Sequence, residues 1–219
     1  MPIENLATIC FDWRMVRRQI RKEGLGADSG SALPKQRAVG SSPIAPLWLP
    51  VTDPIPMPRV IQKEVIVPAS PREVWDAWTT VPGVSSFLAP RANLELTIGG
   101  RYEMYFDLDA PLGSQGSEGC KVLSYLPQRM LSFDWNAPPQ FPNVRKERTW
   151  IVVLLEVLGV RRVKVKLTHL GWKEGEEWDE VFRYFTRAWG TVLARLEHRF
   201  STAPIDWSNP YRPASAAPS

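Results

Sequence analysis

The sequence has few cysteines and histidines and no long apolar run. Two cysteines, Cys10 and Cys120, are too few and too widely spaced for a disulfide scaffold or a structural zinc site, so we expect a reducing, cytoplasmic location. The most apolar stretch, residues 150–160, is interrupted by Glu156 and is shorter than the ~18 residues that a membrane span needs. The sequence therefore argues against a disulfide-rich secreted protein and predicts no membrane span.

Charge is also close to balanced. The 27 Lys and Arg residues exceed the 23 Asp and Glu residues by four, without the clustered basic patch of a nucleic-acid binder. The glycine-containing segment 113–119 lacks the Lys-Ser/Thr of a phosphate-binding loop, and no GxSxG nucleophile motif occurs. The two histidines, His169 and His198, form no metal-binding pair in the sequence. We therefore predict no nucleic-acid partner, no metal and no cofactor.

Proline divides the chain into two tails and one folded unit. Eight prolines interleave with glycines in residues 1–58, which predicts a mostly disordered extension, because this composition builds neither helix nor sheet. Four prolines in residues 203–219 predict a second disordered tail, which leaves residues 59–202 as the domain. Met57 directly precedes the domain, so a start there would make residues 1–56 an artefact of an upstream start.

The domain opens with a strand signal and two helix signals. Residues 60–67 are rich in β-branched side chains and predict a strand that ends at Pro68. Residues 70–73, Ser-Pro-Arg-Glu, form a capping box, which predicts a helix that ends near Thr80. A second short helix is predicted at 84–88.

From residue 93 the apolar period changes to two. Leu94, Leu96 and Ile98 alternate with polar residues up to the pair Gly99-Gly100, which predicts a hairpin whose return strand carries Tyr102, Met104 and Phe106. Further strands are predicted at about 120–125, 130–135, 149–157 and 162–169. In the last strand, alternate residues are apolar up to His169, so one face meets the core and the other meets water.

The final predicted element is a long amphipathic helix over residues 178–200, where apolar residues recur at three- and four-residue steps. Gly190 in its middle indicates close approach of another element, a kink or simple relief of packing. The order of elements predicts an α+β fold in which a curved antiparallel sheet wraps around the long C-terminal helix and two short helices close one end.

Several segments, together with this order, resemble a known superfamily. They are residues 67–79 (VPASPREVWDAWT), 99–102 (GGRY), 167–172 (LTHLGW) and 188–190 (AWG). They resemble the SRPBCC superfamily, with its START-like or birch-pollen-allergen-like helix-grip fold, and in particular domains similar to the C-terminal part of the heat-shock protein 90 ATPase activator. The resemblance covers residues 59–202. It implies the fold but leaves the function open, because the superfamily includes lipid carriers, polyketide cyclases, hormone receptors and chaperone activators.

A helix gripping a curved sheet encloses a cavity, so we predict that the protein binds or carries a small hydrophobic molecule. The candidate lining residues are the inward-facing aromatic and apolar residues and one histidine, although each such residue is more often plain core. They are Trp75, Trp78, Phe87, Tyr102, Met104, Phe106, Phe133, Trp135, Val165, Leu167, His169, Phe182, Phe185 and Trp189.

Two alternatives to ligand binding remain open. The strand at 149–157 is apolar on both faces, so its Trp150, Val152 and Leu154 face either binds a protein partner or a second copy, or is covered by residues 44–51. A protein that interacts with a chaperone, as the resemblance to the heat-shock protein 90 ATPase activator implies, would bind its partner through such a face. The other alternative is an enzyme of the cyclase or hydrolase kind, which we favour less than binding and which would have only His169, Tyr102 and Asp134 as acid–base groups.

Overall fold

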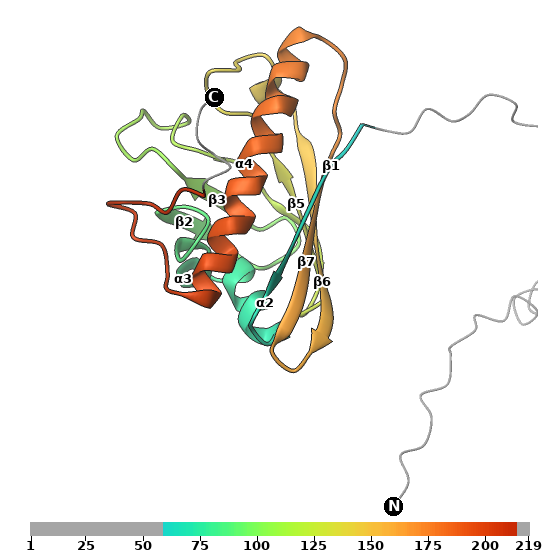
Figure 1. Ribbon diagram of the computed structural model, residues 1–219. Coiled ribbons are helices and arrows are strands. Elements are labelled where there is room, and N and C mark those ends of the chain that lie inside the picture. The colour runs from blue at the N-terminus through green and yellow to red at the C-terminus, as the bar shows by residue number, and fades with distance from the viewer. Residues whose placement is uncertain (1–58, 214–219) are drawn as a thin grey trace, which may run out of the picture. The chain divides into compact units, whose positions relative to one another are not determined.

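The computed structural model describes residues 59–213, and Figure 1 shows them as a curved sheet with one long helix lying across it. The predictions for residues 1–58, including the start at Met57 and the covering role of residues 44–51, lie outside the described residues.

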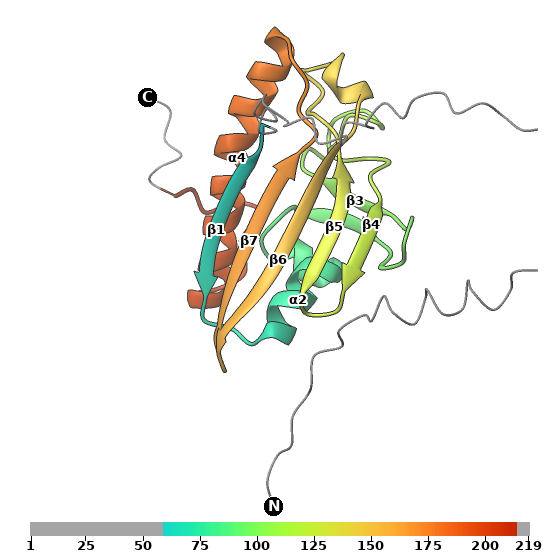
Figure 2. The same cartoon turned by 90° about the vertical axis from the view of Figure 1, so that its right-hand side faces the viewer.

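Five antiparallel strands form the main sheet in the order β1-β7-β6-β5-β4 (Figure 2). Their bounds are β1 Ile61–Val67, β4 Val122–Leu126, β5 Met130–Trp135, β6 Thr149–Gly159 and β7 Arg162–Leu170. Val163, Val165, Leu167 and His169 of β7 are all buried, as their alternation in the sequence predicts. The α+β helix-grip fold is therefore confirmed.

The long helix α4, Glu176–Ser201, lies against one face of this sheet (Figure 1). Its buried side includes Val181, Phe185, Trp189 and Leu196, which follow the predicted apolar stripe. A Cβ atom placed on Gly190 would meet no other atom within 4 Å. Neither a close approach nor relief of packing therefore explains this glycine.

Helix α2, Pro71–Thr79, begins with the predicted capping box. The Ser70 hydroxyl accepts a hydrogen bond from the Glu73 amide at 3.3 Å, and the Glu73 carboxylate accepts one from the Ser70 amide at 2.8 Å. The pairing fixes the start of α2 after β1.

Helix α3, Val81–Ser85, follows α2 directly, so the predicted bounds of 84–88 are wrong. Thr80 serves both helices: its amide donates to the Asp76 carbonyl at 3.2 Å, and its hydroxyl accepts from the Gly83 amide at 3.0 Å. Pro82 lies in the first turn of α3, where the missing amide hydrogen costs no helical hydrogen bond. The predicted end of the first helix near Thr80 therefore coincides with the start of the next helix.

Strands β2, Arg91–Leu94, and β3, Tyr102–Tyr105, form a separate two-stranded sheet. The predicted alternation past residue 94 is wrong, since Leu96 and Ile98 lie beyond β2 and Ile98 is 75% exposed. The Gly99 amide donates instead to the Val122 carbonyl at 2.8 Å, with Gly99 in the left-handed region at φ +80°. This bond turns the chain toward β4.

Residues 203–213 pack on the domain, although the sequence predicts a disordered tail from residue 203. Ile205 is buried and its amide donates to the Ser86 carbonyl at 2.9 Å. The Trp207 indole N–H donates to the Ser85 carbonyl at 2.6 Å. Over these residues the structure differs from the expectation, because side-chain contacts hold the segment without regular secondary structure.

The face of the sheet opposite α4 carries no helix within residues 59–213 (Figure 2). On this face Trp150 and Leu154 of β6 are each 43% exposed, and Val152 between them is half-buried. The predicted two-sided apolar character of this strand is present. Among the helices of the described part, none is long and apolar enough to cross a membrane.

Candidate functional site

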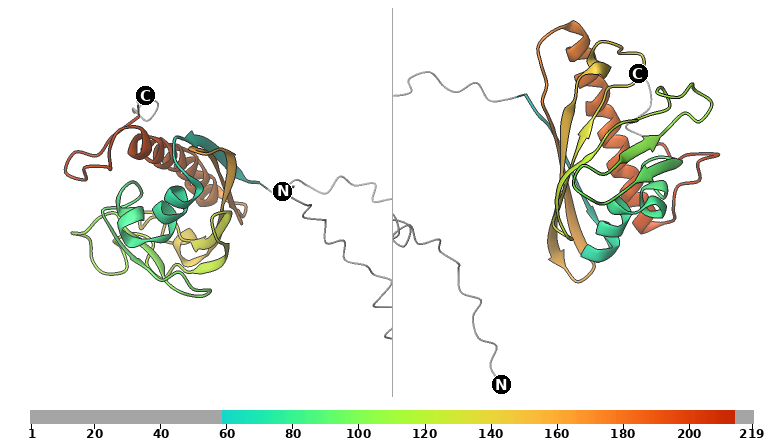
Figure 3. Two further views of the ribbon diagram at one scale, coloured as in Figure 1. Left: turned by 90° about the horizontal axis from the view of Figure 1, so that it is seen from below. Right: turned by 180° about the vertical axis from the view of Figure 1, so that it is seen from behind.

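A cavity of about 1010 Å³ lies between α4, the loop that joins β3 to β4, and the segment that follows β5. The loop extends from the side of the domain that holds the small β2–β3 sheet (Figure 3, right). The volume of the cavity is at the upper end of the range of small-molecule sites. The apolar lining residues are Leu88, Phe106, Ala110, Trp135, Pro138, Pro139, Tyr184, Phe185, Ala188, Trp189 and Val192.

Aromatic rings form one continuous wall of the cavity. The ring centroids of Trp135 and Trp189 are 5.7 Å apart, and Phe185 stacks on Trp189 at 6.2 Å. Phe106 meets Trp135 edge to face at 6.5 Å and is 46% exposed. These are the distances of favourable aromatic pairs, so the wall holds its shape. Trp135, Phe185 and Trp189 are almost fully buried, and Phe106 is the ring of this wall that is open to a ligand.

The polar lining residues lie on the loops and on the outer part of α4. They are Asp107, Ser114, Gln115, Ser117, Asn136, Gln140, Arg187, Thr191 and Arg195. A cavity with an apolar wall and polar side chains on its loops and on α4 suits a ligand that has an apolar part and a polar part.

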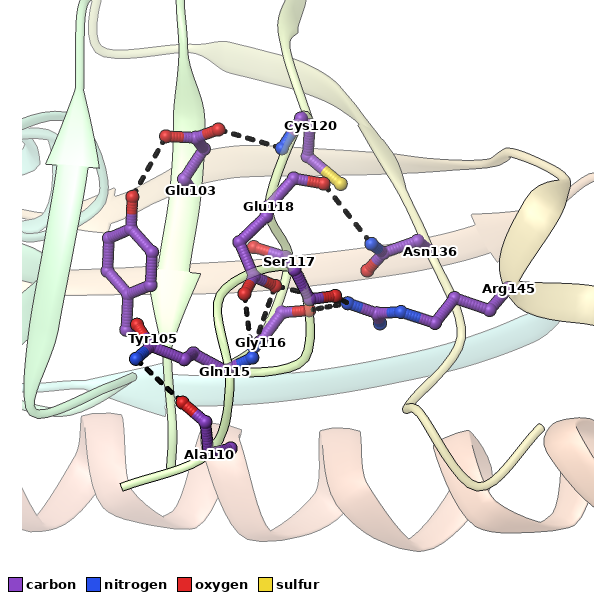
Figure 4. Close-up of polar contacts among 12 residues, drawn as sticks. Glu103, Tyr105, Ala110, Gln115, Gly116, Ser117, Glu118, Cys120, Asn136 and Arg145 are labelled. Carbon is purple, nitrogen blue, oxygen red and sulfur yellow. Dashed lines mark hydrogen bonds and ion pairs between the residues drawn. The ribbon is translucent and has the colours of Figure 1, made fainter. Parts of the chain in front are cut away.

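The β3–β4 loop is held in place by the ion pair of Glu118 and Arg145 (Figure 4). The Glu118 carboxylate accepts hydrogen bonds from the amides of Gln115 at 2.6 Å and Gly116 at 2.8 Å. Arg145 donates to Glu118 at 3.1 Å and to the Gly116 carbonyl at 2.9 Å. Burial acts to raise the pKa of Glu118, but these amides and the charge of Arg145 outweigh it and hold the pKa below its usual value. The carboxylate therefore stays ionised and keeps the loop closed.

Gln115 fixes the same loop from its other side. Its side-chain amide donates to the Ala110 carbonyl at 2.9 Å, and its oxygen accepts from Arg91 at 3.0 Å (Figure 4 shows the first of these). Gln115 is almost fully buried, so its side chain is fixed and the loop forms a well-defined wall of the cavity.

His169 stands behind the aromatic wall and connects its two tryptophans. The Trp189 indole N–H donates to His169 Nδ1 at 2.9 Å, so the imidazole proton lies on Nε2, which donates to Thr149 Oγ1 at 2.8 Å. The Thr149 hydroxyl donates in turn to the Trp135 carbonyl at 3.2 Å. His169 thus orients the Trp189 ring directly, and through Thr149 it is connected to the main chain at Trp135.

Burial lowers the pKa of His169 from 6.5 to about 3. The ring is fully enclosed, and the rings of Trp172 and Phe185 lie 4.3 Å and 4.9 Å from it. His169 is therefore neutral at physiological pH, with both nitrogens engaged in hydrogen bonds within the protein.

Four of the predicted lining residues, Phe106, Trp135, Phe185 and Trp189, line the cavity. Phe182 packs elsewhere, with the Arg59 guanidinium 3.9 Å from its ring centroid. The remaining predicted residues are buried in the core, where neighbouring side chains fill the space around them. They are Trp75, Trp78, Phe87, Tyr102, Met104, Phe133, Val165, Leu167 and His169.

The three acid–base candidates are not brought together. The Tyr102 hydroxyl donates to the Trp78 carbonyl at 2.8 Å inside the core. Asp134 accepts from the Lys121 amide and lies 3.9 Å from Arg148, and His169 is enclosed as described. None of the three lines the cavity, so this geometry offers no acid–base pair to a ligand there.

Several lining residues were missed by sequence reasoning. On α4 they are Tyr184, Ala188, Thr191 and Arg195, which repeat at three- and four-residue steps directly beside the apolar stripe, so the helical period carried a signal for them. Gln115 and Asn136 carried none, because nothing local shows where a long loop folds back.

Comparisons with known proteins agree with this fold. Residues 68–201 match the family described as Activator of Hsp90 ATPase homolog 1-like protein. No relative was found among curated proteins.

Two solved structures show the likeness of fold. A protein from Mesorhizobium loti matches with a TM-score of 0.52 and 18% identity, over 64% of this chain and 95% of that chain. The Aha1 dimer from Colwellia psychrerythraea matches with a TM-score of 0.51 and 18% identity, over 66% of this chain and 98% of that chain. At these identities the likeness concerns the fold alone.

Proposed function

Because the chain belongs to the Activator of Hsp90 ATPase homolog 1-like family, which has the SRPBCC-type fold, we propose that it binds or carries a small hydrophobic ligand in the cavity beside α4. The observation that carries the proposal is the aromatic wall of Trp135, Phe185 and Trp189, which faces a cavity of about 1010 Å³. Beside this wall, Phe106 is 46% exposed and Tyr184 is half-buried, and removing their ring surface from water gains free energy when a ligand binds. We expect the activity in the cytoplasm, where the buried Cys120 stays a free thiol.

A neutral fluorescent probe, N-phenyl-1-naphthylamine, tests the proposal directly. Thr191→Trp places a large ring in the cavity and is expected to weaken binding of the probe by about tenfold or more, because the apolar contact area is taken up. The measurement is a fluorescence titration of the full chain with the probe.

Arg183→Trp is the matched control, since Arg183 is an exposed residue of the same helix that does not line the cavity. Its affinity should equal that of the unmodified protein. Equal binding by both variants would place the probe outside the cavity and contradict the proposed function.

A second candidate function is self-association through the outer face of the sheet. Trp150 and Leu154 are exposed on the same face of β6 with the half-buried Val152 between them, and a contiguous apolar patch of this kind is typical of an interface. The similar protein from Colwellia psychrerythraea is a dimer. We propose a second copy of this chain as the partner.

Sedimentation velocity over a range of protein concentrations tests this second candidate. Leu154→Glu is expected to weaken the dimer by about tenfold or more, because a buried carboxylate loses its hydration. The monomer should remain folded, since Lys166 lies opposite residue 154 in the register. Leu112→Glu, at a loop position that is 91% exposed, is the control. A protein that sediments as a monomer at every concentration would refute self-association.

A further inference from the structure

The α4 side of the cavity carries positive charge beside its aromatic wall. Arg187, Thr191 and Arg195 follow one another at four-residue steps of about 6 Å along the helix axis, which puts them on one side of the helix with the backbones of the two arginines about 12 Å apart. All three line the cavity. They form a polar row next to Trp189 and Val192, which belong to the apolar wall.

Arg195 is the more constrained of the two arginines. Its Nε donates to the Tyr211 carbonyl at 3.1 Å, and its guanidinium lies 5.2 Å from the ring centroid of Trp207. These contacts come from the segment after residue 202 and leave the terminal guanidinium nitrogens without a hydrogen bond to any residue of 59–213. The side chain is half-buried, so it is held in place beside the cavity.

Neither arginine is neutralised within the part of the chain that the structure describes. No carboxylate of residues 59–213 lies within 4.0 Å of Arg187 or Arg195. Among the described lining residues only Asp107 is acidic, and one of its carboxylate oxygens accepts from the Asp109 amide at 3.1 Å in the loop after β3. Burial, and then the nearby charge of Arg212, lower the pKa of Arg195. An anion in the cavity would relieve this unbalanced positive charge.

We propose that the ligand is an amphipathic carboxylic acid. Its apolar part lies against Phe106 and Tyr184 on the open side of the aromatic wall, and its carboxylate is held by Arg187 and Arg195. Guanidinium groups suit this role because they present paired N–H donors that match the two oxygens of a carboxylate. The inference deepens the proposed function and rests on it, since it assigns the chemical class of the ligand in the same cavity.

Two ligands of equal chain length, one charged and one neutral, distinguish the contribution of the carboxylate to binding from that of the apolar chain. Decanoate, below its micelle concentration, and 1-decanol are each titrated against bound N-phenyl-1-naphthylamine. Arg187→Gln and Arg195→Gln are each expected to weaken decanoate binding by about tenfold, because a charge-assisted hydrogen bond is lost, and to change decanol binding by less than about twofold.

Arg183→Gln is the matched control, because it removes the same charge from an exposed position of α4 outside the cavity. It should leave the affinities for both ligands unchanged. Arg187 is also exposed, so Arg187→Gln keeps the test valid if Arg195→Gln loosens residues 203–213.

The outcomes distinguish the two proposals. If the probe and decanol bind in the cavity but decanoate is no more sensitive to the arginine changes than decanol, the carboxylate assignment is wrong and the proposed function stands. If neither the probe nor either ligand binds, the proposed function itself fails. Equal weakening of decanoate by Arg183→Gln would show a general charge effect and would also overturn the assignment.

Discussion

Replacing His169 by alanine is expected to lower the free energy of unfolding by about 3–5 kcal/mol at neutral pH. The change empties a fully enclosed site and removes the partner of two buried groups, the Trp189 indole N–H and the Thr149 hydroxyl. The lost packing and the lost hydrogen bonds both lower the free energy of unfolding. Thermal or urea unfolding of the two proteins measures the difference, and Thr168→Ala, a neighbouring position on the outer face of β7, should cost far less.

The effect of His169→Ala on the free energy of unfolding is also expected to depend on pH. The pKa of His169 is about 3 in the folded protein against about 6.5 in the unfolded chain, so the unfolded chain binds the proton first as the pH falls. Protonation of His169 in the unfolded chain therefore lowers the free energy of unfolding of the unmodified protein by about 2 kcal/mol as the pH falls from 7 to 5. His169→Ala should remove that part of the pH dependence, so the gap between the two proteins narrows toward pH 5. A gap that stays constant, or a loss below about 1 kcal/mol at pH 7, would contradict the buried neutral histidine.

Gly116→Ala is expected to lower the free energy of unfolding by about 3 kcal/mol or more and to weaken probe binding in the cavity. A Cβ atom on Gly116 would lie 1.9 Å from the Met104 carbonyl oxygen, a backbone atom that has no rotamer to escape into. This residue bridges to Tyr105 and so attaches the cavity loop to β3. The loop must therefore move away from β3, and the cavity loses the wall that Gln115 and Gly116 provide.

Gly113→Ala is the control in the same loop. Gly113 has φ +87°, so alanine there costs about 1 kcal/mol of backbone strain, but a Cβ atom would meet nothing within 4 Å. Probe binding should be retained. Unfolding curves and titrations with N-phenyl-1-naphthylamine measure both effects, and a Gly116→Ala protein as stable and as able to bind as Gly113→Ala would show that the close approach to Met104 is absent in solution.

Local signals predicted much of the fold. The Ser70–Glu73 capping box works through groups three residues apart, so it is readable in the sequence and holds in the structure. The alternation of β7 up to His169 is equally reliable, because a strand with one face in the core must place every second side chain there. Where local signals were ambiguous, distant contacts decided: Gly99 bonds to Val122 and ends the predicted alternation early.

The site was predicted less completely for the same reason. Hydrophobic periodicity separates inside from outside, but it does not distinguish an inward ring that faces other side chains from one that faces open space. Tyr102, whose ring stacks on Phe133 at 4.2 Å, and Trp189, which lines the cavity, both appeared as inward aromatics. Only the packing of the neighbouring elements separates them.

By itself the sequence determined the order of elements and the buried face of each long element, because these depend on the spacing of residues along the chain. The family was indicated by the resemblance of short motifs, such as residues 67–79 and 167–172, to a known superfamily. The tertiary structure decided where the cavity lies, since that depends on how the loop closed by Glu118 and Arg145 packs beside α4. It also decided the role of His169, which is held behind the aromatic wall by hydrogen bonds to Thr149 of β6 and Trp189 of α4 and is kept neutral by burial. These properties arise from residues that are distant in the chain and meet only when it folds.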